Sequence, residues 1–283
     1  MEQGYYKSIL ELSQLGIKLA FVTRPGGYNP LHWHEELEIL YPLNGEADII
    51  VEDKKYRLPK KNLTVIESGQ VHSTHTYDKT AMFLRVHVSK SYLQSYLPDV
   101  ELYKIECIPE LISDELFSEY FKICELLAEI TRLYISDESF FRMEAEGLVL
   151  QVLARLFRHF STNKTPQMTD TTVMSIDRIR TIISYVEEHY MENISLDDVS
   201  ELIGVGKEYF CRFFKKNMGM SFLQYLTEVR LSHVYHGLQE TDLPVAELME
   251  ENGFSNQKLF NREFKALYGC TPSAVRKMNK SSQ

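Results

Sequence analysis

The stretch Phe-Cys-Arg-Phe-Phe-Lys-Lys-Asn-Met-Gly at positions 210–219 is repeated fifty residues later as Phe-Asn-Arg-Glu-Phe-Lys-Ala-Leu-Tyr-Gly at positions 260–269. Each copy spaces two phenylalanines four residues apart, which puts both rings on one buried stripe of a helix. The arginine and lysine between and after them lie off that stripe, and glycine is favoured just past a helix end. The repeat therefore predicts two short helices, each with a buried apolar face and an exposed basic face, that bind a polyanion at two places.

A second helix is expected just before each copy. Ser195 is a good N-cap for the first, and the glycine turn 204–206 separates it from the basic helix. Pro244 stands where the start of the other helix tolerates it, Gly253 ends that helix, and Ser255 is placed to cap the next. A helix, a short turn and a second helix form the helix-turn-helix motif, whose second helix enters the DNA major groove. The chain shows this pattern twice.

The residues expected to contact double-stranded DNA share outward positions on the two basic helices: Lys207, Glu208, Arg212, Lys215, Gln257, Lys258, Asn261, Arg262 and Lys265. Lysines 215 and 265 are placed for phosphate and the others for bases. The whole chain is acidic, with 31 Lys+Arg against 40 Asp+Glu. The two basic regions nevertheless each carry a local positive charge, which favours DNA over the alternative of a plain helical bundle. They are Lys207, Arg212, Lys215 and Lys216 against Glu208, and Lys258, Arg262, Lys265, Arg276 and Lys277 against Glu263.

A longer helix is expected between the copies, from Ser221 to Leu238, because its apolar residues recur at helical spacing. About 17 residues at 1.5 Å per residue span roughly 26 Å, near the ~34 Å between successive major-groove faces of one duplex side. One chain is thus expected to read two adjacent major-groove segments.

The motif Gly253-Phe254, Phe260-x-Arg262-x-Phe264-Lys265, Gly269-x-Thr271-Pro272-x3-Arg276 resembles the signature of the AraC/XylS family of transcription regulators. The resemblance runs from about Ser175 to Lys277. The chain departs from the family pattern at 249–251, where small apolar residues are usual, and at Leu259, where an aromatic is usual. The resemblance implies a DNA-binding regulator, an activator that works with RNA polymerase, and a sensor domain ahead of the DNA-binding domain.

Residues 17–90 read as strands, with β-rich runs at 37–43, 47–51, 63–66 and 83–88. Within them, Gly26-x5-His32-x-His34-x3-Glu38-x6-Gly45 resembles the first cupin motif. Glu67-x-Gly69-x2-His72 resembles the second, although Lys61, Glu67 and Thr76 replace its usual glycine, proline and asparagine. The even spacing of His32, His34 and Glu38 predicts that one strand aims all three into a barrel interior.

Three interpretations of these four polar residues stay open. In metal cupins, residues placed as His32, His34, Glu38 and His72 bind a divalent metal, and three imidazoles with a carboxylate suit a first-row ion. The AraC/XylS resemblance instead favours a small polar effector, such as a sugar, held by the same side chains. The third interpretation is that the histidines are merely hydrogen-bonded inside a barrel.

Residues 114–160 are predicted to be helical, with stripes such as Leu116, Tyr120, Ile123, Leu127 and Ile130. The resemblance implies that helices here pair two subunits into a homodimer; the alternative is that they pack only on their own barrel. The predicted fold class is α+β: residues 1–161 form a cupin-like barrel with dimerising helices, 162–174 a linker, and 175–283 an all-α domain with two helix-turn-helix motifs.

The length of 283 residues allows two domains, and 44% hydrophobic residues suits globular cores. The sequence has no signal peptide and no apolar run long enough for a membrane span, and its four cysteines lack close pairing, so we expect a cytoplasmic protein. The prediction is a regulator rather than an enzyme, with no cofactor beyond a divalent metal. The alternatives are a metal-dependent cupin enzyme or metal sensor joined to a DNA-binding domain, and a regulator with a vestigial barrel.

Overall fold

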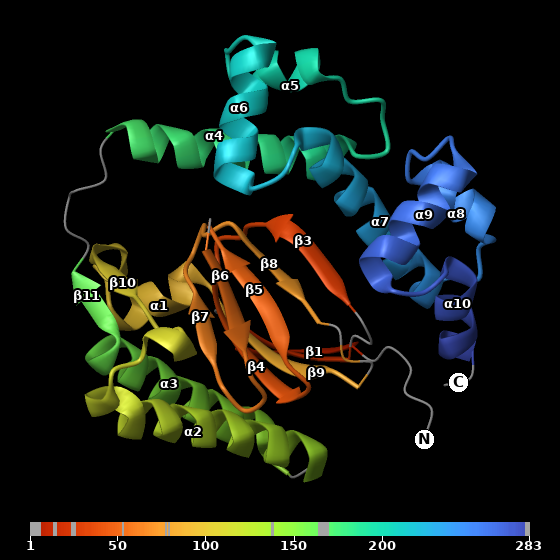
Figure 1. The fold of residues 1–283 in the computed structure, drawn as a ribbon. Coiled ribbons are helices and arrows are strands. Elements are labelled where there is room, and N and C mark those ends of the chain that lie inside the picture. The colour runs from red at the N-terminus through yellow and green to blue at the C-terminus, as the bar shows by residue number, and fades with distance from the viewer. Residues whose placement is uncertain are drawn as a thin grey trace.

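The computed structural model describes residues 7–280, apart from 14–15, 24–26, 53, 77, 79, 137–138 and 164–169. Two antiparallel sheets form the N-terminal barrel (Figure 1). The first has the order β1 (Lys7–Ser13), β2 (Ile17–Thr23), β9 (Met82–Val88), β4 (Leu37–Asn44) and β7 (Thr64–Ile66). The second has the order β3 (Tyr28–His32), β8 (His72–His75), β5 (Ala47–Val51) and β6 (Lys54–Leu58). The predicted strands are confirmed within one residue at each end, whereas β1 lies outside the region predicted to be strands.

The two faces of β4 serve different cores. Leu37, Ile39 and Tyr41 point to the helices outside the barrel, and Leu40 packs inward against the four-stranded sheet. Glu38 shares the inward face with Leu40, because side chains alternate along a strand. A strand buried on both faces reads as a nearly continuous apolar run, so the single acidic residue in this run marks the polar interior of the barrel.

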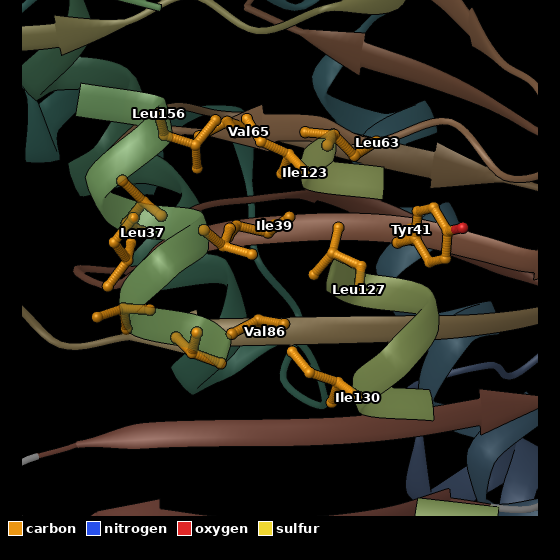
Figure 2. Close-up of a cluster of buried hydrophobic side chains, with 14 of the residues drawn as sticks. Leu37, Ile39, Tyr41, Leu63, Val65, Val86, Ile123, Leu127, Ile130 and Leu156 are labelled. Carbon is orange, nitrogen blue, oxygen red and sulfur yellow. The ribbon is translucent and has the colours of Figure 1, made fainter. Parts of the chain in front are cut away.

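Two long antiparallel helices, α2 (Phe117–Ser136) and α3 (Phe141–His159), cover the outer face of the five-stranded sheet. Figure 2 shows Ile123, Leu127 and Ile130 of α2 packed over the strands. The short elements around them are α1 (Lys90–Tyr96), η1 (Val100–Leu102), β10 (Tyr103–Ile105), η2 (Pro109–Leu111), η3 (Asp114–Leu116) and β11 (Ser161–Asn163). The predicted stripe of α2 therefore packs on its own barrel, and a dimer through these helices stays a prediction.

The C-terminal half is helical: α4 (Asp170–His189), α5 (Leu196–Leu202), α6 (Lys207–Met218), α7 (Phe222–Glu240), α8 (Val245–Glu251), α9 (Gln257–Tyr268) and α10 (Pro272–Lys280). Both predicted helix-turn-helix pairs are present, as α5–α6 and α8–α9. Glycines 219 and 269 follow α6 and α9 at φ of 71° and 68°, the left-handed region that favours glycine. The N-cap of α9 is Asn256, not Ser255 as expected, since the Asn256 side chain accepts from the Leu259 N–H.

The segment between the two domains is shorter than the predicted linker 162–174. Strand β11 pairs with β10 up to Asn163, and α4 begins at Asp170. The rest of the predicted linker, including Pro166, lies outside the described residues, as does Gly26 of the first cupin motif. Among the helices that the structure describes, none combines the length and the apolar character that a bilayer crossing requires.

Candidate functional site

The two recognition helices α6 and α9 present the predicted DNA contacts on their outer faces. All nine of these residues are exposed. Beneath them, Phe210, Phe214, Phe260 and Phe264 are fully buried, which fixes each helix by its apolar side and leaves the basic side outward. The structure therefore brings the sequence-predicted residues onto two matched surfaces.

The charged groups on the two helices have different neighbours. Lys207 lies 2.7 Å from Asp197 of α5, and Arg262 lies 2.7 Å from Glu263 of its own helix. Arg276, which the sequence placed among the basic residues near α9, donates instead to the Leu243 carbonyl at 2.6 Å. It therefore ties α10 to the turn before α8. This role depends on a backbone carbonyl that no sequence motif identifies.

Helix α7 joins the two motifs. Its 19 residues span roughly 28 Å, close to the distance predicted from the sequence. Ser221 caps its first turn by accepting from the Gln224 N–H. Residues on several sides of α7 are buried, because it packs against both motifs and against β3 of the barrel.

The second candidate site lies in the barrel and consists of His32, His34, Glu38 and His72, here called the histidine–glutamate cluster. The prediction that one strand presents the first three was wrong. His32 ends β3, His34 lies in the connection that follows, and Glu38 belongs to β4 in the other sheet. Chain reversal between the sheets brings these residues together with His72 of β8, because the barrel closes there.

The three histidines of the cluster are oriented in the same way. Each Nδ1 lies 2.8–3.0 Å from a backbone carbonyl two residues away, at Pro30, Glu36 and Gln70 respectively. A carbonyl only accepts, so each Nδ1 carries a hydrogen. In a neutral imidazole oriented in this way, Nε2 is the lone-pair position. One ligand atom from each of the three rings lies within 4.8 Å of the others.

Glu38 is the charged centre of this cluster, with 1% of its surface exposed. Its Oε2 lies 3.1 Å from Nε2 of His34 and 3.2 Å from Nε2 of His72, and its Oε1 lies 3.5 Å from Nε of Arg85. Burial opposes ionisation, but the charge of Arg85 and the hydrogen bond with His34 outweigh it and hold the Glu38 pKa well below its usual range. The carboxylate is therefore charged at neutral pH.

The protonation of the rings follows from their surroundings. Burial and the neighbouring His72 lower the pKa of His32 well below its usual value. Burial also lowers the pKa of His34, but the hydrogen bond and charge of Glu38 reverse this effect and raise it. A proton on His34 Nε2 therefore lies in the hydrogen bond between this nitrogen and the Glu38 carboxylate. A metal ion that bound here would replace that proton.

Sequence motifs missed two further residues of the site, Arg85 and His87 on β9. His87 stands opposite Glu38 in the strand register, and its Nε2 lies 3.9 Å from Glu38 Oε1. Burial lowers the pKa of His87 to about 4. Arg85 and His87 alternate along β9, which is one weak signal. Only the pairing of β9 with β4 places them at the cluster.

The donor set fits a divalent first-row metal. Metal–ligand bonds of about 2.0–2.2 Å place neighbouring ligand atoms roughly 2.8–3.6 Å apart, and the Glu38–histidine distances fall in that range. His72 Nε2 is buried and has no hydrogen-bond partner among the described residues. Backbone carbonyls that fix Nδ1–H are the usual support of metal-binding histidines. Against the fit, Asn29 Nδ2 lies 3.1 Å from His32 Nε2, and Arg85 competes for Glu38.

A small cavity inside the barrel reaches the cluster through Arg85, the partner of Glu38. A cavity of about 10 Å³ lies among residues that include Leu40, Thr74, Phe83 and Arg85. That is room for about one water, whereas pockets for organic ligands measure roughly 300–1,000 Å³. A sugar does not fit in this cavity.

Residues 199–278 match a family model described as a helix-turn-helix domain, and residues 20–87 match one described as a cupin domain. The chain is 23% identical over 266 residues to the uncharacterised helix-turn-helix transcriptional regulator YdeC of Bacillus subtilis (strain 168). That alignment covers 89% of this chain and 88% of the relative.

A second uncharacterised helix-turn-helix transcriptional regulator, from Staphylococcus aureus (strain MRSA252), is 23% identical over 85% of this chain, which spans 31% of that longer relative. Among solved structures, an apo ToxT variant from Vibrio cholerae strain SCE256 aligns with a TM-score of 0.53 and 12% identity. The alignment covers 93% of this chain and 97% of ToxT, which shows a shared two-domain fold.

Proposed function

The chain belongs to the AraC/XylS family of transcription regulators and carries a cupin domain ahead of its DNA-binding domain, and from this premise we propose that it regulates transcription in response to a divalent metal ion. The ion is held by the histidine–glutamate cluster. The observation that carries this proposal is the common orientation of the three rings, whose Nδ1 atoms all face carbonyls. When bound, the ion supplies a fixed positive charge between the imidazoles and the carboxylate.

Sequence-specific DNA binding is tested with duplexes selected from a random-sequence library by the full-length chain. We expect the double variant Arg212→Ala/Arg262→Ala to lose binding to the selected duplex, since an arginine–guanine contact is worth about 1–3 kcal/mol. Arg132→Ala on α2 is the matched control, because Arg132 is exposed and far from α6 and α9. Equal dissociation constants for the double variant and the wild type would contradict the proposed interface.

Metal binding is tested by elemental analysis of the full-length chain after chelation and reloading with Zn(II) or Mn(II). We expect about one equivalent per chain, lost in His72→Ala, because His72 supplies a buried lone pair. His75→Ala is the control, since His75 lies on the same strand but belongs to neither histidine group able to hold a metal. Metal content below about a tenth of an equivalent, unchanged by His72→Ala, would remove the metal from the proposal.

The family resemblance also predicts a sugar-like effector and activation through RNA polymerase, and both stay predictions. The small size of the cavity next to Arg85 favours the ion over the sugar. A regulatory role is favoured over the alternative of a metal-dependent cupin enzyme, because residues 199–278 match the helix-turn-helix family model and the similar proteins are transcriptional regulators.

We further propose a homodimer through the outer face of α2 and α3. Phe121, Ile135, Phe140 and Met143 are 55–77% exposed there, which is more apolar surface than a solvated face needs. Sedimentation of the full-length chain at micromolar concentration is expected to give a dimer that Phe121→Glu weakens, with Tyr96→Glu on α1 as the control. A monomer at every concentration would contradict this pairing.

A further inference from the structure

A second group of potential metal ligands lies beside the histidine–glutamate cluster. It consists of His34, Glu36 and His87, and one ligand atom from each of these residues lies within 4.8 Å of the others. Two imidazoles and a carboxylate suit the same first-row divalent ions as the cluster itself. We call this group the outer triad. It shares His34 with the cluster and adds two donors that the cluster does not contain.

The outer triad lies between the cluster and the solvent. In the cluster, the side chains of Glu38 and His72 are only 2% and 1% exposed. Exposure rises to 17% at His34, 24% at His87 and 34% at Glu36. An ion that approaches from this side therefore meets the triad before it reaches the buried carboxylate.

The connection from β3 to β4 and the pairing of β9 with β4 build the outer triad. In the connection, Nδ1 of His34 donates to the Glu36 carbonyl at 3.0 Å, and Oε2 of Glu36 lies 3.7 Å from the same nitrogen. His87 stands opposite Glu38 in the strand register, and its ring centroid lies 5.1 Å from that of His34. Nε2 of His34 lies 3.1 Å from Oε2 of Glu38. The His34 ring therefore has the triad carboxylate near one nitrogen and the cluster carboxylate near the other.

His34 can bind one ion at a time, because a neutral imidazole has a single lone pair. An ion that moves from the triad to the cluster keeps His34 as a ligand. It exchanges the other two donors of the triad for the other three residues of the cluster. Each ligand that is lost is replaced by a new one, so the ion is never left without ligands in a buried place, where an unpaired charge is costly.

We propose that the outer triad is the entry site through which a divalent metal ion reaches the histidine–glutamate cluster, with His34 as the ligand that stays bound during the transfer. This inference rests on the proposed function, because the cluster is the destination of the ion. An entry site changes how fast the ion arrives and leaves, and not how tightly the cluster holds it. Loss of a triad donor should therefore slow association and dissociation by the same factor and leave the dissociation constant unchanged.

Stopped-flow measurement of zinc exchange by the full-length chain tests this role. A zinc-sensitive dye supplies the ion for association, and excess EDTA removes it for dissociation. Glu36→Gln keeps the shape of the side chain and removes a charged donor. We expect both rate constants to fall about fivefold, which corresponds to about 1 kcal/mol in the barrier. The dissociation constant from equilibrium competition should stay at the wild-type value, which also shows that the variant is folded.

Glu35→Gln is the matched control. Glu35 is the neighbouring residue in the same connection, is exposed, and belongs to neither group of potential metal ligands. Its replacement removes the same charge, and it should change the rates by less than about twofold at about 0.15 M salt, where screening is strong. Equal slowing in the two variants would show that charge alone attracts the ion, and would overturn the entry site.

The stoichiometry gives a second test that does not depend on rates. Because His34 binds one ion at a time, the wild type should hold about one equivalent even in excess Zn(II). About two equivalents per chain would show that the triad and the cluster fill independently, and would overturn the transfer through His34. If Glu36→Gln loads at the wild-type rate while His72→Ala loses the metal, the entry site is overturned and the proposed metal site stands. Absence of zinc binding by the wild type would overturn both.

Discussion

The two helix-turn-helix motifs have one plan but place their stabilising caps on opposite helices. In the first, Ser195 forms a capping box with Asp198 at the start of α5, while the recognition helix α6 begins at Gly206 without a side-chain cap. In the second, α8 begins at Pro244 without a side-chain cap, and Asn256 caps the recognition helix α9. The cap of the first motif thus stabilises its supporting helix, and the cap of the second stabilises its predicted recognition helix.

Charge distinguishes the two motifs as well. The position fifty residues before Glu263 is Phe213, which is 7% exposed and part of the core. Glu263 instead pairs with Arg262, whose side chain is 72% exposed, while no ion pair to Arg212 occurs among the described residues. Arg212 can therefore contact DNA without breaking an ion pair among the described residues, whereas Arg262 must first separate from Glu263.

The largest expected effect concerns the equivalent cores of the two motifs. Phe214→Ala and Phe264→Ala remove equivalent rings that are both fully buried, and each should cost about 3–5 kcal/mol of unfolding free energy. Urea denaturation of the full-length chain measures this loss. Phe121→Ala, at a ring that is 55% exposed, should change stability by about 0.5 kcal/mol or less. A loss below about 1 kcal/mol at either buried site would show that the motifs do not share one packing plan.

The arginines should differ in their effect on DNA affinity. Arg212→Ala should cost about 1–3 kcal/mol on the selected duplex, the value of an arginine–guanine contact. Arg262→Ala should cost less, because the exposed pair with Glu263, worth about 0–1 kcal/mol, is given up when Arg262 binds DNA. Titration of both single variants against the same duplex compares them. A larger loss for Arg262→Ala would reverse this ranking.

The repeat explains why the helical half was predictable. Apolar spacing and terminal glycines are local signals, and they located α6, α7 and α9 with the outward residues correctly assigned. The capping of α9 was misassigned by one residue, because Ser255 and Asn256 are both good caps and only the backbone path decides between them. The role of Arg276 depends on a distant carbonyl and carries no local signal.

The sequence predicted which residues form the barrel site, but not which strands and connections carry them. The cupin spacing identified the four residues of the cluster, but even spacing wrongly placed His34 and Glu38 on one strand with His32. The chain leaves β3 after His32, so the alternation of side chains along a strand does not continue to His34 and Glu38. Arg85 and His87 enter through the pairing of β9 with β4, and such nonlocal pairing leaves no mark in the spacing of residues.

Removing the caps should separate stability from DNA binding. Ser195→Ala and Asn256→Ala should each cost about 1 kcal/mol of stability, the usual value of an N-cap side chain. Only Asn256→Ala should also weaken binding to the selected duplex, measured at a temperature where both variants are folded. The reason is that loss of this cap frays the first turn of α9, which carries Gln257 and Lys258. Thermal unfolding and titration together measure both effects. Equal losses of DNA affinity would mean that cap position has no functional consequence.

The smallest expected effect is a gain. Glu263→Gln keeps the shape of the side chain, removes a negative charge from the DNA-facing helix and releases Arg262. We expect about a twofold to fivefold increase in affinity at low salt, since an exposed pair is worth at most about 1 kcal/mol. The gain should shrink as salt rises, because screening weakens both the lost pair and the repulsion of phosphate. Glu251→Gln, exposed at the end of α8 and off the recognition helix, is the control for total charge. If both variants gain equally, net charge alone explains the increase, and the pairing of Arg262 with Glu263 does not distinguish the two motifs.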